Sequence, residues 1–373
     1  EICACLVGSE MCIRDSTTGG GSANASMKSD GTPNRNWQNN MDNGGGGPNG
    51  MGRPDDNGNG MGGDPPTMPT ADDTGLTIEA TANAATDSDS TSTSAKALKA
   101  GSEVNISGGE FKIDSADDSV HSNGNIVVTG GNISAASGDN GMHANGNLTI
   151  SDGTVDITKS YEGIEGSIVT IDGGTISVVA SDDGINCAGG SDTGSTGRMG
   201  ADQFSSQDGV ELHINEGTVT IDADGDGLDS NGNFTMAGGT VYVCGPTNGG
   251  NGALDYNGTA TVTGGTLIAC GAVGMEEGFG DSSTQYSVLH DLGSTVSANE
   301  KLTITNSDGK EILSFTPTKT WQSVVFTSAD LKECETYTIT AGLQSETVTI
   351  DGIVTSNSKG KNFGGGHGGR RGF

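Results

Sequence analysis

The sequence predicts an all-β protein: a right-handed parallel β-helix of seven or eight coils, closed by a small C-terminal antiparallel β domain. Three observations predict this fold, namely an unusual composition, a fixed repeat and a two-residue alternation within each repeat. Gly accounts for 65 of the 373 residues and aromatic residues for only 4%. That composition disfavours an ordinary helical or α/β enzyme domain.

The repeat is marked by a Gly-Gly-like turn in the middle of the chain. From Gly108-Gly109 to Gly264-Gly265, successive turns are 22, 22, 21, 43, 22 and 26 residues apart. Self-similarity at such a period is typical of a solenoid, in which each unit buries its apolar face only by stacking on its neighbours.

Apolar and polar residues alternate before and after each turn, as in Leu148-Thr149-Ile150 and Val241-Tyr242-Val243. A period of two indicates strands rather than helices. Stacking the repeats in register predicts three interior ladders, and therefore three short strands per coil. The ladders are Phe111, Ile133, Val155, Ile176, Val219, Val241 and Leu267; Ile113, Ala135, Ile157, Val178, Ile221, Val243 and Ala269; and Val120, Met142, Ile164, Ile185, Leu228, Leu254 and Met275.

The repeat also sets the expected domain boundaries. We expect the β-helix at residues 75–281, with a loop insertion at 189–209 that accounts for the 43-residue spacing. Residues 282–352 are expected to form the β cap, which covers strand edges that the last coil would otherwise expose.

The two ends of the chain differ from the middle. Residues 17–74 and 353–373 are Gly-rich and too poor in apolar residues to fold, so we expect a disordered linker and a disordered tail. Residues 1–16 share neither the period nor the acidity of the rest and resemble a translated sequencing adapter. We therefore exclude them from fold reasoning and expect a truncated N-terminus, in which the signal peptide of a secreted or cell-surface protein is not visible.

Charge narrows the expected partners. The chain has 17 Lys and Arg against 48 Asp and Glu, a formal net charge of −31. Such a charge repels nucleic acids and anionic lipids. The longest aliphatic run in the chain is Ile126-Val127-Val128, which is far shorter than the roughly 20 apolar residues of a membrane-spanning helix. Carboxylates attract multivalent cations, and Ca²⁺ is the cation that prefers oxygen ligands, so the expected cofactor is Ca²⁺.

Two columns of outward residues flank the third ladder, and we call them, with their adjacent carboxylates, the acidic stripe. The first column is Asp118, Asn140, Glu162, Asp183, Asp226, Gly252 and Val273, and the second is His121, His143, Glu165, Asn186, Asp229, Asp255 and Glu276. Carboxylates stacked at about 5 Å repel one another unless cations lie between them. The alternative is that the Asp-Gly and Asn-Gly pairs here only supply turn conformations with positive φ. The candidate metal ligands are Asp118, Asp139, Asn140, Glu162, Glu165, Asp182, Asp183, Asp224, Asp226, Asp229 and Asp255.

Motifs within this stripe resemble those of the secreted β-helical carbohydrate-binding proteins of clostridia and related bacteria. The resemblance covers about Lys96 to Asp351. It implies binding of calcium and of acidic polysaccharide, with the stripe residues at the matching acidic positions. The matching segments are Lys159-Ser160-Tyr161-Glu162-Gly163-Ile164-Glu165-Gly166, Ser181-Asp182-Asp183-Gly184-Ile185-Asn186, Gly225-Asp226-Gly227-Leu228-Asp229 and the segment from Gly245 to Tyr256.

Charge independently favours an acidic sugar such as polygalacturonate, because a protein at −31 holds a polyanion only through bridging cations. Tyr161, Tyr242 and Tyr256 are the outward tyrosines of the solenoid, too scattered for the aromatic platform of a neutral-glucan binder. The candidate sugar contacts are Lys159, Tyr161, Asn186 and Tyr256, although Tyr161 and Tyr256 would serve equally to shield the coil edge. The Gly-rich ends either touch a cell wall or are simply solvated.

The main rival function is a calcium-dependent polysaccharide lyase, which needs a Lys or Arg base. Lys159 is the candidate base, but the carboxylates around it favour an ion pair. We therefore expect a non-catalytic protein, with the lyase as the alternative.

Cys244 and Cys270 each follow the second glycine of their turn by five residues, so they should be neighbours on the outer face. Stacked positions near 5 Å permit a disulfide, and an exported protein is in a compartment where one forms. The pair is either a disulfide or two thiols.

His121 and His143 also stack. Because neither a Cys nor a third His joins them, we interpret them as exposed polar residues rather than as a transition-metal pair.

Overall fold

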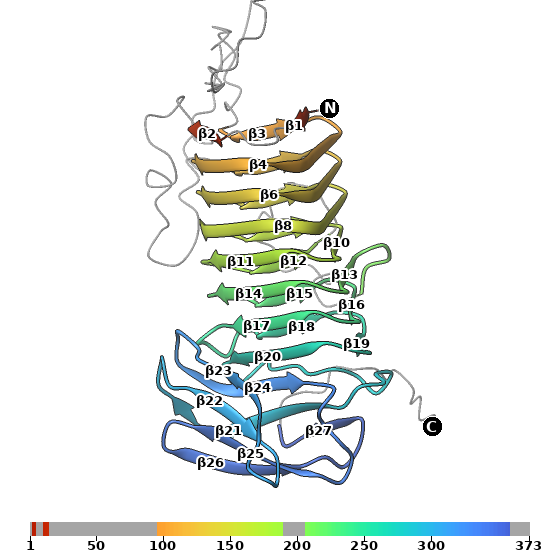
Figure 1. Ribbon diagram of the computed structural model, residues 1–373, viewed down its shortest axis with the longest axis vertical. Helices are drawn as coiled ribbons and strands as arrows, with labels where there is room; N and C mark the ends of the chain where they lie inside the picture. Colours follow the sequence, from red (N-terminus) through yellow and green to blue (C-terminus); the bar gives the residue numbers. More distant parts are fainter. Residues whose placement is uncertain (1, 5–9, 15–94, 189–205, 359–373) are drawn as a thin grey trace, which may run out of the picture.

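The structure is a computed structural model that describes residues 2–4, 10–14, 95–188 and 206–358. These residues form strands joined by turns and loops, and they stack as a β-solenoid of about seven coils with a repeat of about 22 residues. A small C-terminal domain lies at the end of the stack (Figure 1). The all-β solenoid fold with a C-terminal antiparallel sheet is confirmed.

Each coil contributes strands to two parallel sheets. In the first three full coils, the first two strands run on as one long strand: β4 (Glu103–Ser115), β6 (Asn125–Ser137) and β8 (Asn147–Ser160). Later coils divide this strand in two: β10 (Ile168–Ile171) and β11 (Thr175–Ala180), β13 (Glu211–Ile214) and β14 (Thr218–Ala223), β16 (Asn233–Met236) and β17 (Thr240–Cys244), and β19 (Ala260–Val262) and β20 (Thr266–Gly271). All belong to one large sheet.

The third strands form a separate seven-stranded sheet along the other side of the solenoid. Its strands are β3 (Leu98–Ala100), β5 (Val120–Ser122), β7 (Met142–Ala144), β9 (Ile164–Gly166), β12 (Ile185–Cys187), β15 (Leu228–Ser230) and β18 (Leu254–Tyr256). This sheet positions the acidic stripe.

The pairing register confirms the first two ladders throughout and the third as far as Leu254. Met275 was wrongly assigned to the third ladder, because the chain leaves the coil after β20 and this side chain is 39% exposed. The second glycine of every predicted turn has a φ between 75° and 98°, a conformation that glycine adopts without strain. These glycines are Gly109, Gly131, Gly153, Gly174, Gly217, Gly239 and Gly265.

The 43-residue spacing adds no coil. Strand β11 pairs directly with β14 (Ile176 with Val219), and β12 pairs directly with β15 (Ile185 with Leu228). The extra chain therefore lies between β12 and β13, and residues 189–205 of the expected insertion lie outside the described residues.

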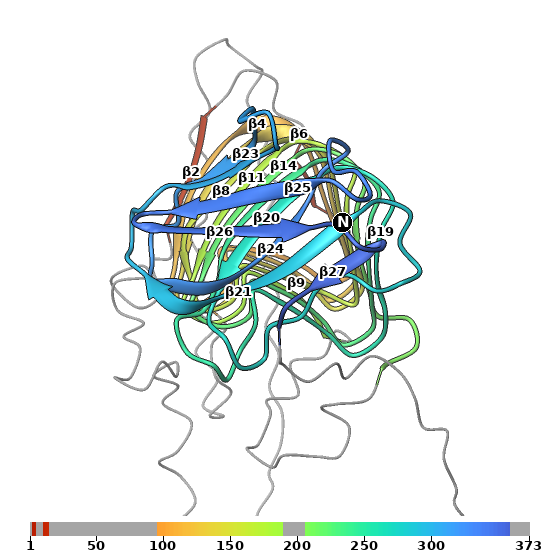
Figure 2. The same cartoon turned by 90° about the horizontal axis from the view of Figure 1, so that it is seen from below.

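The C-terminal domain covers the last coil. Strand β24 (Trp321–Thr327) pairs antiparallel with β20 and with β21 (Ser287–Val296), which pairs in turn with β27 (Val354–Ser356). A four-stranded antiparallel sheet completes the cap: β22 (Leu302–Thr305), β23 (Glu311–Phe315), β25 (Thr336–Ala341) and β26 (Gln344–Thr349). Figure 2 shows these strands crossing the end of the solenoid. The boundary predicted at residue 352 was too early, because β27 belongs to the cap.

At the opposite end, β1 (Ile2–Ala4) and β2 (Glu10–Arg14) pair in parallel with β4, although they fall in the segment that we set aside as adapter-like. The predicted linker at 17–74 lies outside the described residues. Across the parts of the chain that the structure describes, no helix combines the length and apolarity needed to span a membrane.

Candidate functional site

The second column of the acidic stripe lies in register along the seven-stranded sheet, as predicted. Each member pairs with the next from one coil to the following one, so their side chains project from the same face at the spacing of stacked strands. The column is His121, His143, Glu165, Asn186, Asp229 and Asp255, and Lys99 extends it by one coil.

The glycines that follow the first column are required by close packing and not by turn geometry. A Cβ on Gly141, Gly163, Gly184 or Gly227 would lie 2.7, 2.2, 2.5 or 2.4 Å from a carbonyl oxygen of the next coil. None of these four is among the residues with positive φ. Turn chemistry therefore does not explain their Asn-Gly, Glu-Gly and Asp-Gly pairs.

Aspartates of the first column join successive coils. In Asp118, Asp183 and Asp226, one carboxylate oxygen accepts the backbone N–H of the stripe residue in the next coil, at distances of 3.1, 2.7 and 2.5 Å. Each of these bonds uses Oδ1. In Asp118 the other carboxylate oxygen, Oδ2, contacts Lys96 and His121.

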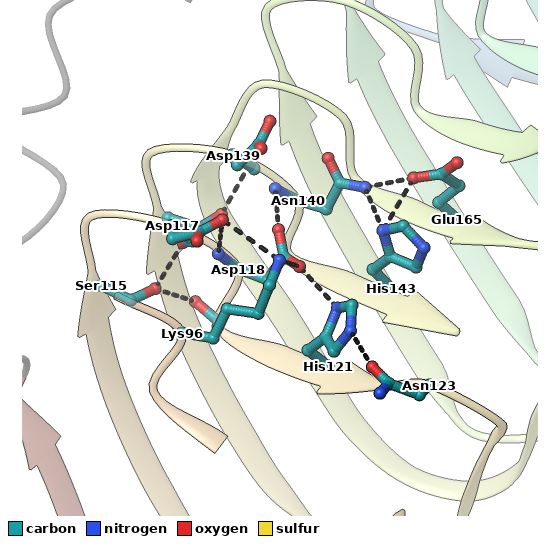
Figure 3. A network of polar contacts seen from close by, with 12 residues as sticks. Lys96, Ser115, Asp117, Asp118, His121, Asn123, Asp139, Asn140, His143 and Glu165 are labelled. Atoms are coloured by element: carbon teal, nitrogen blue, oxygen red, sulfur yellow. Dashed lines mark hydrogen bonds and ion pairs between the residues drawn. The ribbon is translucent and has the colours of Figure 1, made fainter. Parts of the chain in front are cut away.

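The N-terminal end of the stripe contains its own counter-charges. We call Lys96, Asp118, His121, His143 and Glu165 the histidine cluster (Figure 3). Lys96 contacts Asp118, while Nδ1 of His121 lies 2.8 Å from Asp118 and Nδ1 of His143 lies 3.1 Å from Glu165. The two imidazole rings have centroids 4.9 Å apart.

Burial decides how this cluster behaves. His121 is 2% and His143 0% exposed, so the interpretation of these histidines as exposed polar residues was wrong. Burial alone would raise the pKa of Asp118, but hydrogen bonds from His121 and Lys96 and the charge of Lys96 outweigh it and lower the pKa to about 2. Asp118 is therefore ionised and neutralised by the protein itself.

Two groups at this end have ligand atoms close enough to hold a metal ion. Asp118, His121 and His143 form the first, and Asp117, Asp118 and Asp139 the second, with all ligand atoms of a group within 4.8 Å of one another. Asn140, a predicted ligand, instead uses its side-chain amide to contact Glu165 and His143.

The C-terminal end of the stripe is different. We call Glu162, Asp182, Asp183, Asp226, Asp229, Asp255 and Glu277 the carboxylate cluster. Burial, with mutual repulsion for most of them, raises the pKa of every one, to about 7 for Asp226 and about 8 for Glu277. The pKa values of Glu162, Asp183 and Asp229 rise well above the usual range. The charged groups that raise the pKa values of these three are other carboxylates.

Three buried side-chain oxygens next to this cluster have no hydrogen-bond partner: Oε2 of Glu162, Oδ1 of Asn186 and Oε2 of Glu277. Asn186 is only 8% exposed and lies between Glu165 and Asp229 in the column. A buried oxygen without a donor is costly, and a cation that prefers oxygen ligands removes that cost. These residues fit Ca²⁺, whereas the two imidazoles in the histidine cluster suit a transition metal better.

Glu277 was missed by the sequence reasoning, which placed Glu276 in the column. Glu276 instead contacts the backbone of Gly274 and the hydroxyl of Ser358. Because the column ends at β18, the two adjacent glutamates could not be told apart from the repeat alone.

Asp224, another predicted ligand, has a counter-charge from the cap. Its carboxylate lies 3.1 Å from Nζ of Lys319, which also lies 2.9 Å from Asp222. Asp224 is exposed and needs no metal to balance its charge.

The candidate sugar contacts occupy different environments. Tyr161 and Tyr256 are partly buried, and burial raises the pKa of both phenols. Tyr161 bonds Asp182 in the carboxylate cluster, whereas the hydroxyl of Tyr256 donates to the carbonyl of Gly278 at 2.7 Å. Lys159 is exposed at the end of β8. Tyr161 adjoins the cluster through Asp182, and Tyr256 adjoins it through a backbone hydrogen bond to Glu277.

Cys244 and Cys270 are neighbours in register, as predicted, but both are buried free cysteines, at 4% and 1% exposed. The disulfide is therefore not formed in this structure. Sγ of Cys244 accepts a hydrogen bond from the hydroxyl of Thr318 at 3.2 Å, while Cys270 packs in the core shared with the cap. Cys187 is buried in the solenoid core.

Comparison with known proteins bears on the function of this site. A family model described as carbohydrate-binding domain-containing protein matches residues 59–141 and 142–252, which together make up just over half of the chain. No curated protein and no solved structure matches. The chain, a β-solenoid with a line of carboxylates along one sheet, belongs to the family of carbohydrate-binding domain-containing proteins.

Proposed function

We propose that this protein binds acidic polysaccharide, such as polygalacturonate, through calcium ions held by the carboxylate cluster, and that it does so without catalysis outside the cell or at its surface. The observation that carries the proposal is the carboxylate cluster itself: seven carboxyl groups of raised pKa, two of which have a buried oxygen without a donor, as does the adjacent amide of Asn186. The family supports a carbohydrate ligand.

The cluster supplies what a calcium site requires. Ca²⁺ takes six to eight oxygen ligands and tolerates irregular geometry. Glu162, Asp183 and Asp229 provide carboxylates on consecutive coils, and Asn186 adds an amide oxygen without a donor. Bound calcium supplies positive charge, which holds these carboxylates in the ionised form and attracts the carboxylates of the sugar.

Charge makes the bridging ion necessary. At a net charge of −31, direct contact between the acidic stripe and a polyanion is repulsive. Calcium shared between protein and sugar carboxylates converts this repulsion into attraction. Tyr161, bonded to Asp182 at the side of the cluster, lies where a sugar ring held there would contact it.

Titration of the protein with polygalacturonate tests the proposal, first with calcium and then with excess chelator, while binding heat and the ultraviolet absorbance of unsaturated product are followed together. We expect strong binding heat with calcium, at most weak heat in excess chelator, and no absorbance. Asp183→Asn and Asp229→Asn should each weaken binding at least tenfold, since each removes a charged ligand. Asp156→Asn, the same substitution on β8 away from the cluster, is the matched control.

Two results would contradict the proposal. Binding that is unchanged by chelation would remove calcium from the account. Absorbance that rises with time and disappears in Lys159→Ala would show a lyase instead.

A further inference from the structure

A hollow of about 380 Å³ lies between the outer face of the solenoid and the edge of the cap, away from the seven-stranded sheet. It is where β23 comes alongside β20 (Figure 1). The solenoid side of the lining is Thr220 on β14 and Tyr242 on β17. The cap side is Ser314 and Phe315 on β23, with Lys301 just before β22 and Thr316 just after β23.

The hollow exists because the cap covers the last coil fully and the coil before it only in part. Thr220, Tyr242 and Ile268 are neighbours in register on β14, β17 and β20. Ile268 is 0% exposed beneath the cap, whereas Tyr242, one coil earlier, is only half-buried. The segment that links β23 to β24 is anchored to the solenoid, with the hydroxyl of Thr318 2.5 Å from Asp222. This bond anchors the cap side of the hollow to the solenoid.

Two aromatic rings form the apolar side of this hollow. Tyr242 of the solenoid and Phe315 of the cap stack with their centroids 5.4 Å apart and their planes inclined by 24°. Rings stacked in this way cover part of each other and leave the outer side of the pair as an apolar surface, on which the C–H face of a sugar ring packs. The hydroxyls of Thr220 and Thr316 around it can bond the sugar hydroxyls, whereas that of Ser314 bonds Glu311.

Charge indicates which kind of sugar fits. Lys301 is the one charged side chain of the lining. Its ammonium lies 3.1 Å from Glu311, and the two side chains are 54% and 48% exposed. An ion pair this exposed contributes little to stability, so a carboxylate of a ligand can replace Glu311 at small cost. A cationic group beside an aromatic surface suits a sugar acid rather than a neutral sugar.

We propose that this hollow is a second, calcium-independent subsite for one uronic acid residue of a polysaccharide. The ring of the sugar packs on the open side of the stacked Tyr242 and Phe315 rings, and the carboxylate of the sugar pairs with Lys301. The choice of sugar class rests on the proposed function, but the subsite needs neither calcium nor the carboxylate cluster.

The test is saturation-transfer NMR with tetragalacturonate on the full chain in excess chelator, where the calcium-bridged site is silent. We expect weak binding by the unaltered protein, a loss of about tenfold or more in affinity for Lys301→Gln, as for removal of a charge-assisted bond, and a similar loss for Tyr242→Ala. Lys310→Gln, an exposed lysine of the same domain, should leave binding unchanged. Cellotetraose, a neutral sugar of equal length, should bind distinctly more weakly.

The outcomes separate the two proposals. Chelator-resistant binding that depends on Lys301 supports the subsite even if calcium-dependent binding is never found. The subsite is refuted by calcium-dependent binding alone, by chelator-resistant binding that Lys301→Gln leaves intact, or by equal binding of cellotetraose.

Discussion

The raised pKa values of the carboxylate cluster predict that the calcium-free protein loses stability as the pH rises. The pKa of Asp226 is about 7 and that of Glu277 about 8 in the folded protein, against roughly 3.9 and 4.3 for these side chains in an unfolded chain. Between about pH 4 and pH 8 the folded state therefore holds protons that the unfolded state has released. Where the folded state binds more protons, the free energy of unfolding falls with increasing pH.

The magnitude follows from the size of the shift. One pKa unit corresponds to about 1.4 kcal/mol, and the shift of Asp226 is about three units. Partial exposure of this side chain reduces its contribution, which leaves about 2 to 4 kcal/mol lost from Asp226 alone between pH 4 and pH 8. Calcium reverses the trend, because it displaces these protons. Its apparent affinity should fall about tenfold per pH unit below pH 7 for each proton displaced.

Urea unfolding at pH 5, 6, 7 and 8 in chelator measures the first effect. Calorimetric titration of calcium in two buffers of different ionisation enthalpy measures proton release. Asp226→Asn should flatten the pH dependence, whereas Asp156→Asn should not. Stability that stays level or rises from pH 5 to pH 8 in chelator, or calcium binding without proton release, would refute the electrostatic reasoning.

Three further predictions concern packing, charge and thiols. Gly184→Ala places a methyl group against the next coil and should destabilise the protein by about 3 kcal/mol in urea unfolding; a loss below 0.5 kcal/mol would mean that the coils do not stack this closely. Lys96→Met leaves a buried aspartate without its ammonium and should cost about 3 kcal/mol, whereas an unchanged melting temperature would show that the contact is unimportant. Alkylation followed by peptide mass spectrometry should label exposed Cys334 in the native protein and Cys244 and Cys270 only after unfolding, without reductant; a requirement for reductant would reveal a disulfide.

Most of the fold could be predicted because each coil repeats the same pattern. In-register stacking of parallel strands turns a linear period into a spatial column, so the pairing of Glu165 with Asn186 and of Asn186 with Asp229 followed from the turn spacing alone. The prediction was wrong at Met275, where the chain leaves the last coil and the period no longer determines which side a residue faces.

Contacts between the solenoid and distant segments could not be predicted from the repeat. The counter-charge of Asp224 comes from Lys319, 95 residues along the chain, and Tyr242 acquires an aromatic neighbour, Phe315, from the cap. Burial of His121 was also missed, because an outward position in the repeat predicts exposure unless neighbouring side chains cover it.

The most direct test of the central claim is a crystal structure of the protein grown with calcium and an oligogalacturonate. We predict anomalous density for at least one calcium ion within the carboxylate cluster, 2.3 to 2.6 Å from oxygens of residues such as Glu162, Asp183 and Asp229, with a sugar carboxylate completing its coordination. A carboxylate cluster without density at saturating calcium, or a sugar bound only elsewhere, would contradict the account.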